Sequence, residues 1–90
     1  PEYHIAKNRI DLTPETDVDA ILAQVKEKYS AMPDAQVNAI DGVKIDFADK
    51  WVHLRKSNTE PIIRIYSEAH TMDEADELGK SIMNIVYSMA

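Results

Sequence analysis

The chain has 90 residues, of which 44% are hydrophobic, and sixteen aspartates and glutamates outweigh ten lysines and arginines to give a formal charge of −6. This length accommodates one small domain with one layered core. The negative charge argues against general nucleic-acid binding, the lack of cysteine excludes disulfides and thiolate metal sites, and no apolar run is long enough to span a membrane. We therefore expect a cytoplasmic protein with neither a membrane nor a nucleic acid as partner.

The first third of the chain predicts a strand and then a helix. Residues 2–12 alternate weakly between apolar and polar side chains, as a strand does. Apolar residues then recur at spacings of three and four from residue 17 to about 31, which predicts an amphipathic helix. Thr13 and Thr16 are candidate N-caps for it, and Pro14 fits a first helical position. The apolar stripe of this helix is Val18, Ile21, Leu22, Val25 and Tyr29.

The middle of the chain predicts three short strands, at residues 43–47, 51–55 and 62–68. The pair Asp41-Gly42 before the first of them is typical of a tight turn. Apolar and polar side chains alternate along each strand, so one face of the sheet should be buried and the other open. The residues that we expect on the open face are Trp51, His53, Arg55, Ile62, Arg64 and Tyr66.

Residues 70–90 predict a second helix. Thr71 and Glu74 have the spacing of a capping box, and Gly79 within the helix indicates close packing rather than function. The apolar stripe is Ala75, Leu78, Ile82, Val86 and Met89. The order β-α-β-β-β-α predicts an α+β two-layer sandwich, in which an antiparallel sheet of about four strands has both helices on one face.

Several residues that could carry chemistry have simpler explanations. His4, His53 and His70 do not have metal-ligand spacing, so no metal site is expected in this chain. The acidic residues at the start of the second helix complement its dipole. Ser57 has no neighbouring base and lies in no G-x-S-x-G turn, so a nucleophilic role is not expected.

The stretch from Arg55 to Thr59 is the strongest candidate for a binding site. Arg55 carries a planar fork of donors that suits phosphate, Ser57 and Thr59 carry hydroxyls, and Asn58 tolerates unusual backbone angles. Small residues at a turn can also aim backbone N–H groups at an anion, as a nest. Residue chemistry leaves two interpretations open, namely an anion-binding loop and an ordinary solvated turn.

The sequence "RKSNTEPIIRIYSEA", residues 55–69, resembles the C-terminal signature of the α-D-phosphohexomutases, the phosphoglucomutase/phosphomannomutase family. The family pattern Arg-x-Ser-(Gly or Asn)-Thr-Glu-Pro-x-x-Arg is met at Arg55, Ser57, Asn58, Thr59, Glu60, Pro61 and Arg64. The resemblance covers most of residues 37–88, whereas the first 36 residues match only in arrangement.

This resemblance implies a fold and a role. The fold would be that of the family's fourth domain, which is similar to the TATA-binding protein. Arg55, Ser57, Asn58 and Thr59 would hold the phosphate of a hexose phosphate, with Lys56, Glu60 and Arg64 in support. We expect Lys56 to add positive potential rather than a defined contact. Asn58 in place of glycine favours a phosphomannomutase/phosphoglucomutase over the phosphoglucosamine branch.

The resemblance also implies that the chemistry lies outside residues 1–90. Full-length relatives are Mg²⁺-dependent isomerases of carbohydrate metabolism. They use a phosphoserine and a hexose 1,6-bisphosphate intermediate to interconvert hexose 1-phosphate and hexose 6-phosphate. This chain contains none of the catalytic, metal or sugar-binding loops. With Pro1 as its first residue, we expect it to be one domain of a longer multidomain chain, inactive alone, with the upstream domains as partners.

One alternative comes from the open face of the sheet. Trp51, His53 and Tyr66, together with Arg55 and Arg64, would lie there and could form a stacking platform. The chain would then be a non-catalytic module that binds single-stranded nucleic acid or protein.

Overall fold

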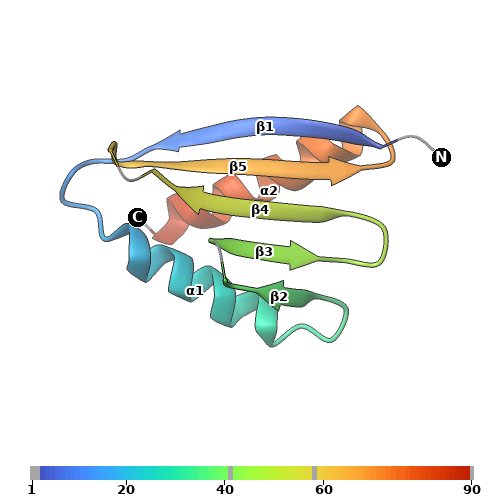
Figure 1. Cartoon of the computed structure of the whole chain (residues 1–90), viewed down its shortest axis with the longest axis horizontal. Coiled ribbons are helices and arrows are strands. Elements are labelled where there is room, and N and C mark those ends of the chain that lie inside the picture. Colours follow the sequence, from blue (N-terminus) through green and yellow to red (C-terminus); the bar gives the residue numbers. More distant parts are fainter. Residues whose placement is uncertain (1–2, 41, 58, 90) are drawn as a thin grey trace.

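The computed structural model describes residues 3–40, 42–57 and 59–89. Pro1, Asp41 and Asn58 therefore lie outside the described residues. Five strands form one antiparallel sheet in the order β1-β5-β4-β3-β2 (Figure 1). The strands are β1 (His4–Asp11), β2 (Gln36–Asn38), β3 (Val43–Asp46), β4 (Trp51–Lys56) and β5 (Ile62–Ala69). The helices are α1 (Val18–Ser30) and α2 (Met72–Met89).

Both helices cover the same face of the sheet, as the sequence predicted. The α1 side chains Leu22 and Val25 and the α2 side chains Ile82 and Val86 belong to one buried cluster with the inward-facing strand residues. The strand members of this cluster are Ile10, Val43, Ile45, Val52, Leu54, Ile63 and Ile65. They alternate with polar residues, which leaves the opposite face of the sheet open. The α+β two-layer arrangement is confirmed.

The structure differs from the prediction in three local features. A short segment that precedes Gly42 forms a fifth strand, β2, which is only three residues long. The N-cap of α1 is Asp17, whose side chain accepts from the Ala20 N–H at 3.0 Å, so neither threonine caps this helix. Ile62 is 3% exposed, although alternation placed it on the open face. Its N–H donates to the Glu60 carbonyl at 2.8 Å across Pro61, so regular alternation begins only after this tight turn.

Close packing of α2 on the sheet explains Gly79. A Cβ at this position would lie 2.8 Å from Asn8 Nδ2 and 3.1 Å from Ser67 Oγ. Ser67 is fully buried and donates to the Ala75 carbonyl oxygen at 2.7 Å. At the start of the helix, Thr71 Oγ1 accepts from the Glu74 N–H at 3.1 Å, as a cap does. Neither of the two described helices combines the length and the apolar character needed to cross a membrane.

Candidate functional site

The candidate loop, residues 57–61, joins β4 to β5 at one end of the sheet (Figure 1). Three backbone hydrogen bonds hold its described part. The Ser57 N–H donates to Ile62 O at 3.2 Å, and the Ile62 N–H donates to Glu60 O at 2.8 Å. Leu12, just after β1, donates its N–H to Pro61 O at 2.8 Å. The loop is therefore attached to three consecutive strands of the sheet.

The two hydroxyl side chains of the loop lie together. Ser57 Oγ is 3.2 Å from Thr59 Oγ1, and it accepts from the Thr59 N–H at 3.2 Å. The N–H groups of both residues are thus already bonded within the loop. Ser57 and Thr59 therefore do not form the nest of inward-facing amides that small residues at a turn can provide. The donors that they offer a ligand are their hydroxyls.

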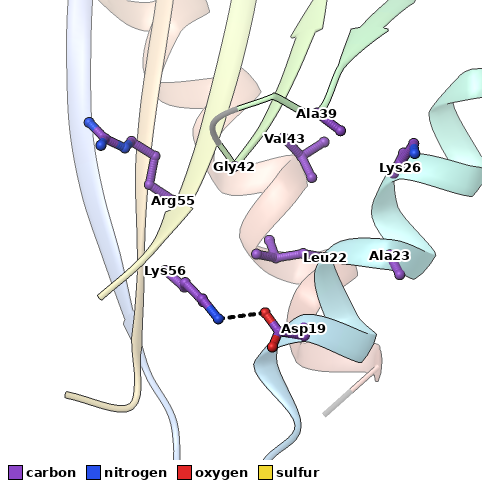
Figure 2. A pocket seen from close by; sticks show the side chains of 9 residues that line it. All are labelled: Asp19, Leu22, Ala23, Lys26, Ala39, Gly42, Val43, Arg55 and Lys56. Carbon is purple, nitrogen blue, oxygen red and sulfur yellow. Dashed lines mark hydrogen bonds and ion pairs between the residues drawn. The ribbon is translucent and has the colours of Figure 1, made fainter. Parts of the chain in front are cut away.

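Arg55 and Lys56, at the end of β4, point in different directions. The Lys56 side chain extends toward α1, where its Nζ lies 2.8 Å from Asp19 Oδ1, whereas Arg55 turns away from this ion pair (Figure 2). Alternation along a strand explains the divergence, because successive side chains point to opposite faces. Lys56 therefore has a defined contact within the chain, and Asp19 offsets part of the potential that we expected it to supply.

Gly42 controls the surroundings of Arg55 from the turn between β2 and β3. Its φ is 73°, a left-handed conformation that favours glycine. A Cβ here would collide with the Leu54 carbonyl oxygen and would lie 3.3 Å from Arg55 Cγ. The stem of Arg55 thus passes close to a backbone position where only glycine fits. The sequence predicted a tight turn at Asp41-Gly42, of which the structure describes only Gly42.

A cavity of about 370 Å³ adjoins the loop on the helix side of the sheet (Figure 2). Its volume is in the range of small-molecule sites. The turn before β3 and residues 19–26 of α1 form its walls, and the Lys56–Asp19 ion pair lies at one end of it. It is lined by Asp19, Leu22, Ala23, Lys26, Ala39, Gly42, Val43, Arg55 and Lys56.

Apart from the buried Ile62, the open face carries the residues that alternation assigned to it. The register places Trp51 opposite Glu68, His53 opposite Tyr66, and Arg55 opposite Arg64. The face is not an open aromatic platform, because Lys44 Nζ lies 5.0 Å from the centre of the Trp51 ring.

Among the described residues, no group of three or more His, Asp or Glu side chains could hold a metal ion.

Fold and loop together define an α+β domain with an arginine and two hydroxyls gathered at one end of an open sheet. The family model for the phosphoglucomutase/phosphomannomutase C-terminal domain matches residues 17–85. The chain therefore belongs to the phosphoglucomutase/phosphomannomutase family and corresponds to the C-terminal domain of its members. The match starts at the first helix, so the relationship reaches further toward the N-terminus than the motif alone indicated.

Individual relatives agree with this assignment. A phosphoglucosamine/phosphogalactosamine mutase of Sulfurisphaera tokodaii is 41% identical over 86 residues, which are 96% of this chain and 19% of the relative. A phosphoglucomutase/phosphomannomutase of Thermococcus kodakarensis is 42% identical over 77 residues, 86% of this chain and 16% of the relative. A probable phosphoglucosamine mutase of Thermococcus gammatolerans is 34% identical over 86 residues, 96% of this chain and 19% of the relative.

These relatives are phosphohexomutases, and the chain spans about a fifth of their length. Their names include both glucosamine and glucose or mannose phosphates. The preference that we inferred from Asn58 therefore has no support in the relatives' names. Two contacts near the loop escaped sequence reasoning, the Asp19–Lys56 pair and the approach of Leu12 to Pro61. Both join distant parts of the chain and leave no local sequence signal.

Proposed function

We propose that this domain binds the phosphate group of a sugar phosphate in a phosphohexomutase that interconverts the 1-phosphate and the 6-phosphate. The observation that carries the proposal is the convergence of Ser57 Oγ and Thr59 Oγ1, 3.2 Å apart, in the loop that follows Arg55. Hydroxyl donors beside an arginine fork suit a phosphate, since charge-assisted hydrogen bonds to it are stronger than neutral ones. Asn58, between the two hydroxyls in sequence, is proposed as a fourth contact.

A loop that recognises only the phosphate fits this reaction. The phosphate at one end of the sugar has to be held while the other end reacts, and either end has to be acceptable. As the family resemblance implies, we assign the choice between hexose and hexosamine to a sugar-binding loop in other parts of the protein. Lys56, Glu60 and Arg64 are proposed as supporting residues.

The remaining requirements of the reaction are proposed for the rest of the enzyme. The described residues offer no metal cluster, so the Mg²⁺ expected for the family would bind outside them. The phosphoserine and the bound hexose 1,6-bisphosphate likewise belong to upstream domains. The cytoplasmic location that we inferred from composition stays a prediction.

Kinetics of the full-length enzyme test this function. Each charged hydrogen bond to the phosphate is worth about 1.5–3 kcal/mol, so Arg55→Ala should lower kcat/KM about 10- to 100-fold. The matched control is Lys80→Ala, which removes the same charge from an exposed position on α2. Equal kcat/KM for the wild type and Arg55→Ala, with glucose 1-phosphate, mannose 1-phosphate and glucosamine 1-phosphate alike, would show that the loop has another role.

A further inference from the structure

All three arginines of the chain lie in one row across the open face of the sheet. Arg9 on β1 is the register partner of Arg64 on β5, and Arg64 is the register partner of Arg55 on β4. Neighbouring strands are about 5 Å apart, so the outer two arginines are separated by about 10 Å at the backbone. Their long side chains, which share one face, can therefore converge above Arg64.

This row concentrates positive charge in an acidic protein. Like charges directly opposite each other on neighbouring strands are destabilising. Arg9 is compensated by Asp11, whose Oδ1 lies 2.6 Å from Arg9 Nη2. Arg64 is exposed and is flanked by an arginine on each side, and its side chain forms no hydrogen bond or ion pair with any residue that the structure describes. An anion above Arg64 would remove this repulsion.

The row lies at the same end of the sheet as the loop. The Leu12 N–H donates to Pro61 O at 2.8 Å, so the chain just beyond β1 touches the loop. The pKa of Arg9 is raised mainly by its hydrogen bond to Asp11 and by the charge of Asp11, with a smaller contribution from Glu60 of the loop. Arg9 is therefore within electrostatic reach of the loop, although the loop begins 48 positions later in the sequence.

We propose that Arg9, Arg64 and Arg55 form one phosphate site together with the loop hydroxyls, and that Arg9 contacts the substrate phosphate. A phosphate dianion has enough acceptor oxygens for several guanidinium forks, whereas a carboxylate has only two oxygens. The inference rests on the proposed function and extends it. Arg9 lies before residues 17–85, the part that the family model matches, so the family motif gives it no role.

The side-chain Nε–Hε signals of the arginines test this proposal directly in an NMR titration of the chain. Only three such signals exist, one for each residue of the row. Titration with inorganic phosphate, and separately with glucosamine 6-phosphate, should shift all three signals with one common Kd, equal to that of the amides at residues 55–59. Sodium chloride at matched ionic strength should not shift these three signals. Salt only screens the charges diffusely, whereas a specific anion site shifts the signals of the residues that bind the anion.

Variants of Arg9 give the matching affinity measurement. Arg9→Ala should weaken binding of both ligands about 3- to 10-fold, which is less than the 10- to 100-fold expected for Arg55→Ala because Arg9 is exposed and already paired with Asp11. Arg9→Lys keeps the charge but loses the fork, so its Kd should lie between those of Arg9→Ala and the wild type. The control Lys7→Ala removes a cation from the same strand and face, one row away, and should leave the Kd within about twofold because screening weakens exposed charges.

The outcomes separate this inference from the function on which it rests. If Arg55 and the loop amides shift while the Arg9 signal stays in place, or if Arg9→Ala binds as tightly as Lys7→Ala, Arg9 is not a contact and the loop function stands. If the three arginines shift while the loop amides do not, the row is an anion site of its own and the shared site is refuted. If no signal moves at saturating glucosamine 6-phosphate, both proposals fail.

Discussion

The Lys56 ammonium and the Asp19 carboxylate form an ion pair of 2.8 Å that joins the first turn of α1 to the end of β4, just before the candidate loop. Both side chains are largely exposed, 45% and 73% respectively, so the pair contributes at most about 1 kcal/mol to stability. Its larger effect is on charge. Asp19 neutralises the cation that directly precedes the loop in the chain, and it does so from a helix 37 residues away in sequence.

Asp19→Asn should therefore tighten phosphate binding. Removing the carboxylate leaves the Lys56 charge uncompensated beside the loop, and we expect a decrease in Kd of about two- to threefold, since surface charges act weakly. Isothermal titration with glucosamine 6-phosphate at low salt measures it. Glu77→Gln makes the same charge change on α2 and should leave the Kd unchanged. A weaker Asp19→Asn complex would mean that the ion pair orders the site rather than attenuating its charge.

Gly42→Ala should destabilise the domain and disturb Arg55. The left-handed φ of 73° and the collision of a Cβ with the Leu54 carbonyl oxygen together cost about 1–3 kcal/mol. Urea unfolding, followed by circular dichroism, gives the change in the free energy of unfolding. Phosphate affinity should fall as well, because the Arg55 stem lies next to this position.

Gly79→Ala is the control for this substitution. Its Cβ would meet the ends of the Asn8 and Ser67 side chains rather than backbone. Alanine also gains about 1 kcal/mol of helix propensity over glycine, which offsets part of the cost. We expect Gly79→Ala to be less destabilising than Gly42→Ala and to leave phosphate affinity unchanged. The opposite order of stability would show that the turn before β3 adapts more easily than the interface of α2 with the sheet.

The sequence predicted both helices, the longer strands and, except at Ile62, the burial of the alternating strand side chains, because periodicity reports burial directly. Alternation correctly separated Val52 and Leu54 from Trp51 and His53. It could not predict β2, since three residues are too few to show a period. It also missed the N-cap, because Thr13, Thr16 and Asp17 all have suitable side chains and the tertiary structure selects among them.

The sequence indicated which residues could form the candidate site but not their geometry, and their binding of phosphate stays a prediction. Arg55, Ser57 and Thr59 stand in a recognisable spacing, and the structure places the two hydroxyls together. The alignment of Arg9 with Arg64 and Arg55 depends on which strands pair and in what register. Register between strands distant in sequence is set by the folded sheet and leaves no local pattern. The same is true of the Asp19–Lys56 pair.

Alkaline pH should destabilise the domain through Tyr29. Burial raises the pKa of this phenol above its usual 10.0. The folded protein therefore keeps the proton at a pH where the unfolded chain has lost it. The stabilising contribution is full below the unfolded pKa of about 10 and is lost as the pH rises through the folded pKa.

Urea unfolding between pH 9 and pH 11 measures this effect. The free energy of unfolding should fall more steeply for the wild type than for Tyr29→Phe, which has no phenol to ionise. Tyr87→Phe changes an exposed tyrosine of α2 and should follow the wild type. Equal slopes for the wild type and Tyr29→Phe would contradict the assignment of the alkaline loss to Tyr29.

The open face should not bind single-stranded nucleic acid. Lys44 covers the Trp51 ring at 5.0 Å, and the chain carries a charge of −6, so neither stacking nor counterion release favours an oligonucleotide. Fluorescence anisotropy of a labelled ten-nucleotide strand should stay flat up to high micromolar protein. Binding that weakens steeply with added salt would instead support an interaction module, and loss of that binding in Trp51→Ala would place it on this face.

The measurement closest to the central claim is an amide titration of this chain with a sugar phosphate. Saturable chemical-shift changes should concentrate at residues 55–59, and Arg55→Ala should weaken the apparent Kd about tenfold or more, as loss of a charged hydrogen bond does. The unphosphorylated sugar should produce no shifts. Shifts spread evenly over the surface, or an unchanged Kd in Arg55→Ala, would contradict a phosphate-binding loop and leave residues 57–61 as a connection between two strands.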